Sequence, residues 1–241
     1  MNTFAAAVSA NGAAAARACA LLSAAPLHDR ARLLCVAEGA LNDWRGHSIG
    51  ALCQQLALTP LAAATALAET SAPDRGARPP RSPHRVAIVL TGRVSNLRPL
   101  QKHMSASGWV NADDDGAAVV SRLIEFHLRK GRPPLEAART ALQRLQGSFA
   151  FAATVAAGEA SIYVAAKNAD AFVGFTADAI YAISDRRLRP ADSEITPLQS
   201  GDVATLRGDH IVITDAGGMG IEKHAWRTKP PTPPHMTLVA P

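Results

Sequence analysis

From residue 148 onward, the hydrophobic pattern of the chain changes from a period of about 3.6 to a period of two. Six short segments carry this period: SFAFAATVA (148–156), ASIYVAAK (160–167), AFVGFT (171–176), AIYAISD (179–185), DVATLRG (202–208) and HIVITDA (210–216). A period of two places successive side chains on opposite faces, which is typical of β-strands. The pattern therefore predicts six short strands joined by turns.

Before residue 148, most apolar positions recur every three to four residues or lie among strong helix formers, which predicts helices. The predicted helices cover residues 13–24, 48–57, 60–69, 95–108, 113–131 and 133–147. Thr59 is expected to cap the third helix, with Pro60 at its first position. Three apolar runs, at residues 3–9, 31–39 and 85–90, are predicted as strands, and a turn at Thr91-Gly92 is expected to stop the last one.

Helices that are grouped apart from the strands indicate separate helical layers on mixed sheets, an α+β layered sandwich. The chain has 241 residues, which fits one large domain or two small ones. Residues 71–84 are rich in Pro and Arg and predict a loop, and residues 229–241 form a Pro-rich run. We expect one domain over residues 1–225 and a C-terminal tail over residues 226–241.

Charge and composition narrow the class of protein. The net charge is +5, and the one basic cluster, PDRGARPPRSPHR at residues 73–85, contains no aromatic residue that could stack on a base. We therefore expect a solvated loop there and no nucleic-acid partner. No apolar stretch is long enough to span a membrane. Three cysteines without a CxxC pair indicate a reducing compartment, so we expect a cytoplasmic protein with these cysteines in its core.

The order of these elements resembles the class II glutamine amidotransferase family, and most closely the glutaminase domain of glutamine–fructose-6-phosphate aminotransferases (glucosamine-6-phosphate synthases). The motifs that carry the resemblance are RVAIVLTGRVSNLRPLQKHMSASGW (85–109), DDDGAAVVSRLIEFHLRKG (113–131), ALQRLQGSFAFAAT (141–154), AAKNADAFVGF (165–175) and LQSGDVATL (198–206). The resemblance implies the four-layer αββα sandwich of N-terminal-nucleophile (Ntn) hydrolases. It assigns residues 1–225 to a glutaminase-like domain.

The resemblance also implies which residues occupy the catalytic positions. The family uses a Cys that follows the initiator Met as nucleophile, with its own α-amino group as base, and this chain has Asn2 at that place. An amide cannot act as that nucleophile, and loss of a nucleophile costs about 10⁶ in rate. Thr91 and Gly92 match the Asn and Gly of the family's oxyanion hole.

Substrate-binding positions are altered in the same way. Asn96 matches the Asn of a Glu-Asn pair, Asp115 is the nearest acid to the residue that holds the substrate's α-amino group, and Arg75 is the candidate for the carboxylate clamp. Strict alignment puts Gly116 at the acidic position. The structural alternative is that Asp113, Asp114 and Asp115 are acids that cap a helix.

Loss at several points of one site, with the scaffold retained, leads to three hypotheses. The first is a catalytically inactive domain that acts as a regulatory or assembly subunit, either bound to an isomerase- or synthase-like partner or as a homo-oligomer. The second is an active glutamine amidotransferase subunit with an altered nucleophile. The third is a sensor that binds an amino acid or a sugar phosphate. We expect no cofactor and no metal, since His84 and His103 have no metal-like partners at a suitable spacing.

Overall fold

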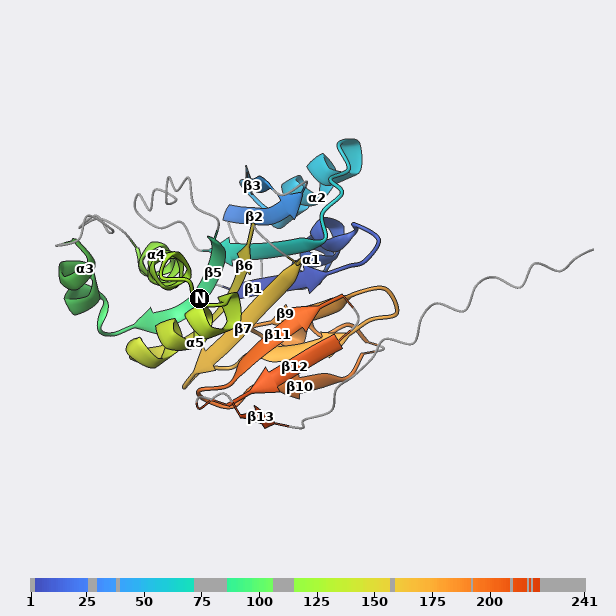
Figure 1. Cartoon of the computed structure of the whole chain (residues 1–241). Coiled ribbons are helices and arrows are strands. Elements are labelled where there is room, and N and C mark those ends of the chain that lie inside the picture. The colour runs from blue at the N-terminus through green and yellow to red at the C-terminus, as the bar shows by residue number, and fades with distance from the viewer. Residues whose placement is uncertain are drawn as a thin grey trace, which may run out of the picture.

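The computed structural model describes residues 3–25, 30–37, 40–71, 86–105, 115–156, 159–191, 193–208, 210–215, 217 and 219–221. In this part of the chain, the elements form four layers in which two β-sheets pack face to face and helices cover the two outer faces (Figure 1). The predicted αββα sandwich, the Ntn-hydrolase-like α+β class, is confirmed. The tail predicted over residues 226–241 lies outside the described residues.

The first sheet contains β1 (Thr3–Val8), β2 (Arg30–Ala37), β3 (Ala40–Gly46), β4 (Thr65–Ser71), β8 (Phe172–Phe175), β9 (Ile180–Ile183) and β10 (Ile195–Pro197). Its strand order is β10-β8-β9-β1-β4-β2-β3, and each neighbouring pair is antiparallel. Because β1 lies at the centre, both faces of this strand are covered, and all six of its residues are buried.

The second sheet contains β5 (Val86–Val94), β6 (Gly147–Val155), β7 (Ser161–Lys167), β11 (Val203–Arg207), β12 (His210–Thr214) and β13 (Gly220–Ile221). Its order is β13-β12-β11-β7-β6-β5, again with antiparallel neighbours. The alternation along β6 explains how it serves two layers: Ala150 and Ala152 face the first sheet, while Phe149 and Phe151 face the helices.

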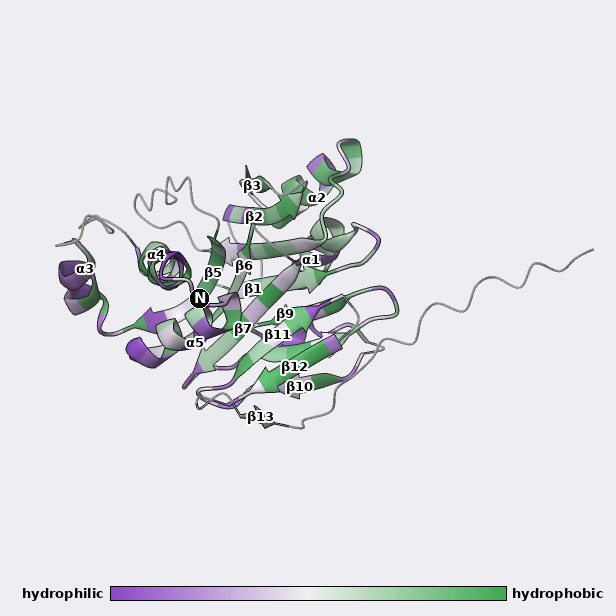
Figure 2. Ribbon diagram, in the orientation of Figure 1, coloured by the Kyte–Doolittle hydropathy of each residue, from purple (hydrophilic) through white to green (hydrophobic). Residues whose placement is uncertain are grey.

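The helices divide between the two outer faces. The helices α1 (Ala14–Leu22) and α2 (Ile49–Leu58) pack on the first sheet, while α3 (Leu97–Ser105), α4 (Gly116–Arg129) and α5 (Pro134–Arg144) are grouped over the second sheet. A short 3₁₀ helix, η1, covers Arg186–Leu188. Figure 2 shows that α3 is the most hydrophilic of the group, and Met104 is its one buried residue. No helix in the described ranges has the length and apolar character needed to cross a membrane.

The helix predicted over residues 60–69 is wrong. Residues 65–71 form strand β4, and Thr59 ends α2 as its C-cap instead of starting a new helix. β4 lies between β1 and β2, where its alanines pack tightly on both sides. Alanine favours helices in isolation, but pairing with two strands outweighs that weak local preference.

Other boundaries also differ from the sequence-based expectation. β5 does not stop at residue 90 but continues through Thr91 and Gly92 to Val94, because both residues pair with β6. The strands β3, β10 and β13 were not predicted. β3 is a partly exposed edge strand with the sequence ALNDWRG, which lacks an apolar alternation.

Candidate functional site

A cavity of about 670 Å³ lies where β4 and β5 end and where α3 and α4 begin. We call it the inter-sheet cavity. It is lined by Glu69, Leu90, Gly92, Arg93, Val94, Ser95, Leu97, Arg98, Pro99, Asp115, Gly116 and Ala117. Its volume lies in the range that small-molecule sites occupy, and its lining carries both acidic and basic groups.

A row of charged side chains runs across the inner face of the first sheet into this cavity. Arg45 Nη2 lies 2.6 Å from Asp43 Oδ2, and Arg32 Nε donates to Asp43 Oδ1 at 2.9 Å. Arg32 Nη1 lies 3.7 Å from Glu69 Oε1. We call Arg45, Asp43, Arg32 and Glu69 the charged row. Because β3, β2 and β4 are neighbours, sheet pairing itself brings the four residues together.

Glu69 is the carboxyl of this row that lines the cavity. Burial raises the pKa of Glu69 to about 7, against the lowering effect of Arg32, and the negative charge of Asp115 raises it further. In contrast, hydrogen bonds from Arg32 and Arg45 outweigh burial at Asp43 and lower its pKa. Glu69 can therefore take up or release a proton near neutral pH, which Asp43 cannot.

Sequence reasoning missed Glu69 because it assigned this segment to a helix. On a helix, Glu69 would be a solvated residue near the C-terminal end. On strand β4, it shares a face with Leu67, which is fully buried between the sheets. The available signal was the alternation of Thr65, Leu67 and Glu69 within an otherwise small-residue run.

Gly92 lines the cavity from a distorted position in β5. Its φ is +86°, and a Cβ at this position would lie 2.3 Å from the carbonyl oxygen of Ser148. Only glycine therefore fits here, which explains its presence without a turn. The neighbouring Thr91 is buried but is not among the residues that line the cavity. The assignment of Thr91 and Gly92 to an oxyanion hole stays a prediction.

Asp115 and Asn96 have defined structural roles. Asp115 is the N-cap of α4 and accepts a hydrogen bond from Ala118 N at 2.7 Å, which confirms the predicted cap, and it also lines the cavity. Asn96 donates to the carbonyl oxygen of Arg144 at 2.8 Å and accepts from Gln146 N at 2.9 Å. Its amide thus joins the start of α3 to the end of α5, and it does not line the cavity.

Two predicted site residues, Asn2 and Arg75, lie outside the described residues, as do Asp113, Asp114 and His84. His103 lies in α3 and is exposed. Within the described ranges, no group of three or more His, Cys, Asp or Glu side chains is arranged to hold a metal ion.

The structure describes all three cysteines of the chain, and all three lie on the outer side of the first sheet, which faces α1 and α2. Cys19 and Cys35 belong to the apolar cluster between this sheet and its helices, and Cys53 packs against the same cluster. Burial raises the pKa of Cys19, and it raises the pKa of Cys35 to about 11. The thiols of Cys19 and Cys35 therefore stay protonated at neutral pH, and none of the three cysteines lines the inter-sheet cavity.

The amino-acid sequence of this chain is similar to those of bacterial aminotransferases. The glutamine–fructose-6-phosphate aminotransferase [isomerizing] of Mesorhizobium japonicum is 34% identical over 140 residues, which is 57% of this chain and 23% of the relative. The Caulobacter vibrioides enzyme of the same name is 30% identical over 204 residues, covering 81% of this chain and 34% of the relative. This chain is a homologue of the glutaminase region of these aminotransferases. It spans about a third or less of their length.

Solved structures agree on the fold. The chain superposes on glutamine phosphoribosylpyrophosphate amidotransferase from B. subtilis, complexed with ADP and GMP, with a TM-score of 0.65 at 15% identity, over 95% of this chain and 49% of that one. A glutamine aminotransferase class-II domain protein from Silicibacter pomeroyi gives a TM-score of 0.56 at 12% identity, over 88% of this chain and 98% of that one. No protein-family model matches the chain. The fold is thus that of class II glutamine amidotransferase domains.

Proposed function

We propose that this domain does not hydrolyse glutamine and acts as a regulatory or assembly subunit of an aminotransferase- or isomerase-like partner. The observation that carries the proposal is the placement of the thiols. All three cysteines lie on the outer side of the first sheet, whereas the inter-sheet cavity opens at the end of its inner side. Attack on a carboxamide by a thiolate needs the sulfur beside the substrate carbon.

The charge in the cavity supports the same proposal. A tetrahedral intermediate of amide hydrolysis carries a negative oxygen, which hydrogen-bond donors must stabilise. Here Gly92 shares the cavity with Glu69 and Asp115 as well as with two arginines. Above pH 7, where Glu69 is ionised, the two carboxyls disfavour a further negative charge beside Gly92. Asn2, which matches the family's nucleophile position in the sequence, adds no ionisable group.

The relatives support the proposal of a protein partner. Each of the two aminotransferases described above carries the matched segment as a minor part of a much longer enzyme. In those proteins, the region works joined to another part of the chain. A homologue that keeps this scaffold can also keep a surface through which the region contacts another protein, which supports a protein partner.

A glutaminase assay with a repaired nucleophile tests the catalytic half of the proposal. We expect no glutamate release from glutamine by the purified chain, and none by the Asn2→Cys variant, because Glu69 still lines the cavity. The double variant Asn2→Cys/Glu69→Gln removes that charge, so we expect glutamate release from this variant. Glutamate release by the unaltered chain, abolished by Thr91→Val or Ser95→Ala, would instead support an active amidotransferase with an altered nucleophile.

Cross-linking in cells that express the chain, followed by mass spectrometry, tests the subunit half. We expect cross-links from the domain to one aminotransferase- or isomerase-like protein, and a native mass that includes it. An isolated monomer without cross-links to another protein would contradict the proposal.

A sensor is the second candidate, and the mixed charge of the cavity favours it. Arg93 and Arg98 are exposed, and neither pairs with a carboxylate in the described part of the chain. Glu69 and Asp115 belong to the same cavity lining. This pattern suits a zwitterion. Calorimetry with glutamine, glutamate and glucosamine 6-phosphate separates a sensor from a regulatory or assembly subunit. Saturable binding that Glu69→Gln and Arg98→Gln weaken supports a sensor. Failure of all three compounds to bind excludes it.

A further inference from the structure

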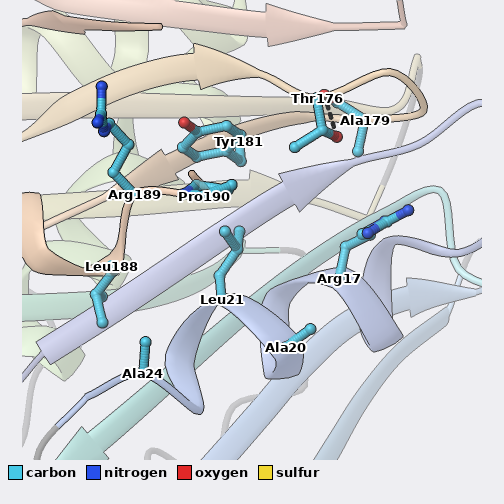
Figure 3. A pocket seen from close by; sticks show the side chains of 10 residues that line it. All are labelled: Arg17, Ala20, Leu21, Ala24, Thr176, Ala179, Tyr181, Leu188, Arg189 and Pro190. Carbon is cyan, nitrogen blue, oxygen red and sulfur yellow. Dashed lines mark hydrogen bonds between the residues drawn. The ribbon is translucent and has the colours of Figure 1, made fainter. Parts of the chain in front are cut away.

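A second cavity, of about 250 Å³, lies between α1 and the chain that follows β8 and β9 (Figure 3). We call it the α1 pocket. It shares no lining residue with the inter-sheet cavity and is on the outer side of the first sheet. Ala20, Leu21 and Ala24 line it from α1 and the residues just beyond, and Leu188 and Pro190 line it from the opposite side. Its middle is therefore apolar.

One end of the α1 pocket carries a cation beside a buried hydroxyl. Arg189 Nη1 donates to the carbonyl oxygen of Ser193 at 3.3 Å, and the Tyr181 hydroxyl lies 2.5 Å from Ser193 Oγ. Figure 3 shows the Tyr181 hydroxyl directed toward the Arg189 side of the pocket. Arg189 is exposed, and no carboxylate pairs with it among the described residues. A guanidinium has five N–H groups, so it retains donors for another acceptor.

The opposite end of the pocket is neutralised. Arg17 Nε donates to Asp178 Oδ2 at 2.8 Å, and its Nη2 contacts the same oxygen. Thr176 Oγ1 donates to Asp178 Oδ1 at 3.0 Å. The two cations that line the pocket are thus not equivalent, because Arg17 has a carboxylate partner and Arg189 has none in this part of the chain. The uncompensated positive charge is at the Tyr181 end alone.

We propose that the α1 pocket binds a small organic acid, with its apolar body against Leu21 and Leu188 and its carboxylate at Arg189. The size fits, because an apolar cavity of about 150 Å³ already holds benzene. The remaining volume accommodates a carboxylate at the polar end. A guanidinium binds carboxylates through paired N–H donors, which a neutral or cationic group of the same shape cannot replace.

Titration of the isotope-labelled full chain by two-dimensional amide NMR tests the proposal, with phenylacetate as the probe. Phenylacetamide is the neutral isostere, and phenethylamine is the cationic control. We expect saturable shifts for residues of α1 and of the segment 176–190, with a dissociation constant on the order of 1 mM for phenylacetate. Phenylacetamide should bind about tenfold more weakly, and phenethylamine should not bind.

Two pairs of variants assign the roles of the residues. Arg189→Gln should reduce the affinity for phenylacetate to that for phenylacetamide, while Arg186→Gln, on the same exposed turn, should leave it unchanged. Ala20→Phe should block both ligands from the rim. Ala16→Phe, at another exposed position on α1 that does not line the pocket, is its matched control.

Several results would overturn the proposal. Equal affinity for phenylacetate and phenylacetamide would show that Arg189 does not select an anion. Shifts confined to residues of the inter-sheet cavity would place the ligand elsewhere. Unchanged binding by Ala20→Phe, with its amide spectrum still that of the folded chain, would mean that the α1 pocket is not the site.

Discussion

The two halves of one face of β4 lie in different surroundings. Leu67 packs between the sheets in the apolar cluster that also contains Ala6, Ala87 and Ala152. Two residues further along the same face, Glu69 joins the charged row and lines the inter-sheet cavity. The apolar half is closed and joins the two sheets, whereas the charged half remains open at the end of the sandwich.

This contrast indicates which positions of the fold tolerate substitution. Interiors are closely packed, so residues of the apolar half are constrained by volume. At the open end, ion pairs and solvent satisfy the polar groups, and residues there can change without loss of the scaffold. We therefore expect substitutions of charge at the open end to disturb this fold less than changes of volume between the sheets.

The largest effect is expected in the apolar half. Leu67→Ala should lower the free energy of unfolding by about 2–5 kcal/mol, because it removes a fully buried side chain and leaves a cavity. Urea unfolding measures the change. Leu58→Ala is the control, since Leu58 is 86% exposed and its loss should cost less than about 0.5 kcal/mol. Similar effects for both variants would contradict the comparison.

In the charged half, Arg32→Met should cost about 2 kcal/mol at pH 8, less than a fully buried pair would, because both partners retain some exposure. The substitution leaves Glu69 and Asp43 without their shared cation. The double variant Arg32→Met/Glu69→Gln should recover part of the loss, which a double-mutant cycle measures. Strict additivity of the two changes would mean that Arg32 and Glu69 do not interact.

The pH dependence of stability separates Glu69 from His127. Glu69 has its pKa raised from an ordinary 4.5 to about 7, so between these values the folded state holds a proton that the unfolded state has lost. This contribution to stability is complete below pH 4.5 and is lost as the pH rises through 7. Its steepest slope is about 1.4 kcal/mol per pH unit.

His127, buried in α4, acts in the opposite direction. Burial, followed by the charges of Arg144, Arg132 and Lys130, lowers its pKa from 6.5 to about 4. Its contribution is present above pH 6.5 and is lost as the pH falls toward 4. The two effects oppose each other between pH 4.5 and 6.5. Glu69→Gln should therefore become more stable as the pH rises through this window, and His127→Leu should become less stable.

Chemical denaturation at half-unit pH intervals checks both slopes. Profiles of the two variants that run parallel to that of the unaltered chain would contradict both assignments. Parallel behaviour of one variant alone would contradict the assignment for that residue.

The smallest effect is expected at the cap of α4. Asp115→Ala should cost about 1 kcal/mol, because it removes the hydrogen bond to Ala118 N. Asp115→Asn keeps a capping oxygen and removes the charge, so its stability should stay near that of the unaltered chain. The same variant should lower the pKa of Glu69, which the charge of Asp115 raises. NMR titration of the Glu69 side chain measures it, and an unchanged pKa would contradict the coupling.

Much of the fold could be predicted from the sequence, and the exceptions have physical causes. β6 was predicted correctly because its bulky and small side chains alternate, with Phe149 and Phe151 toward the helices and Ala150 and Ala152 toward the other sheet. β4 was not, because its helix-forming alanines conceal a strand that pairing on both sides stabilises.

The candidate site was predictable only in part. Asp115 could be found because a cap has a local signature. The charged row could not, because Arg32, Asp43 and Glu69 come from three strands whose pairing is a property of the whole sheet. The error over β4 concealed Glu69 in particular.

Glutamate release from glutamine by the purified chain decides whether this domain hydrolyses glutamine. With the three thiols on the outer side of the first sheet, we predict no release above that of a boiled sample. Steady release that scales with protein concentration and disappears in the Thr91→Val or Ser95→Ala variant would contradict this prediction.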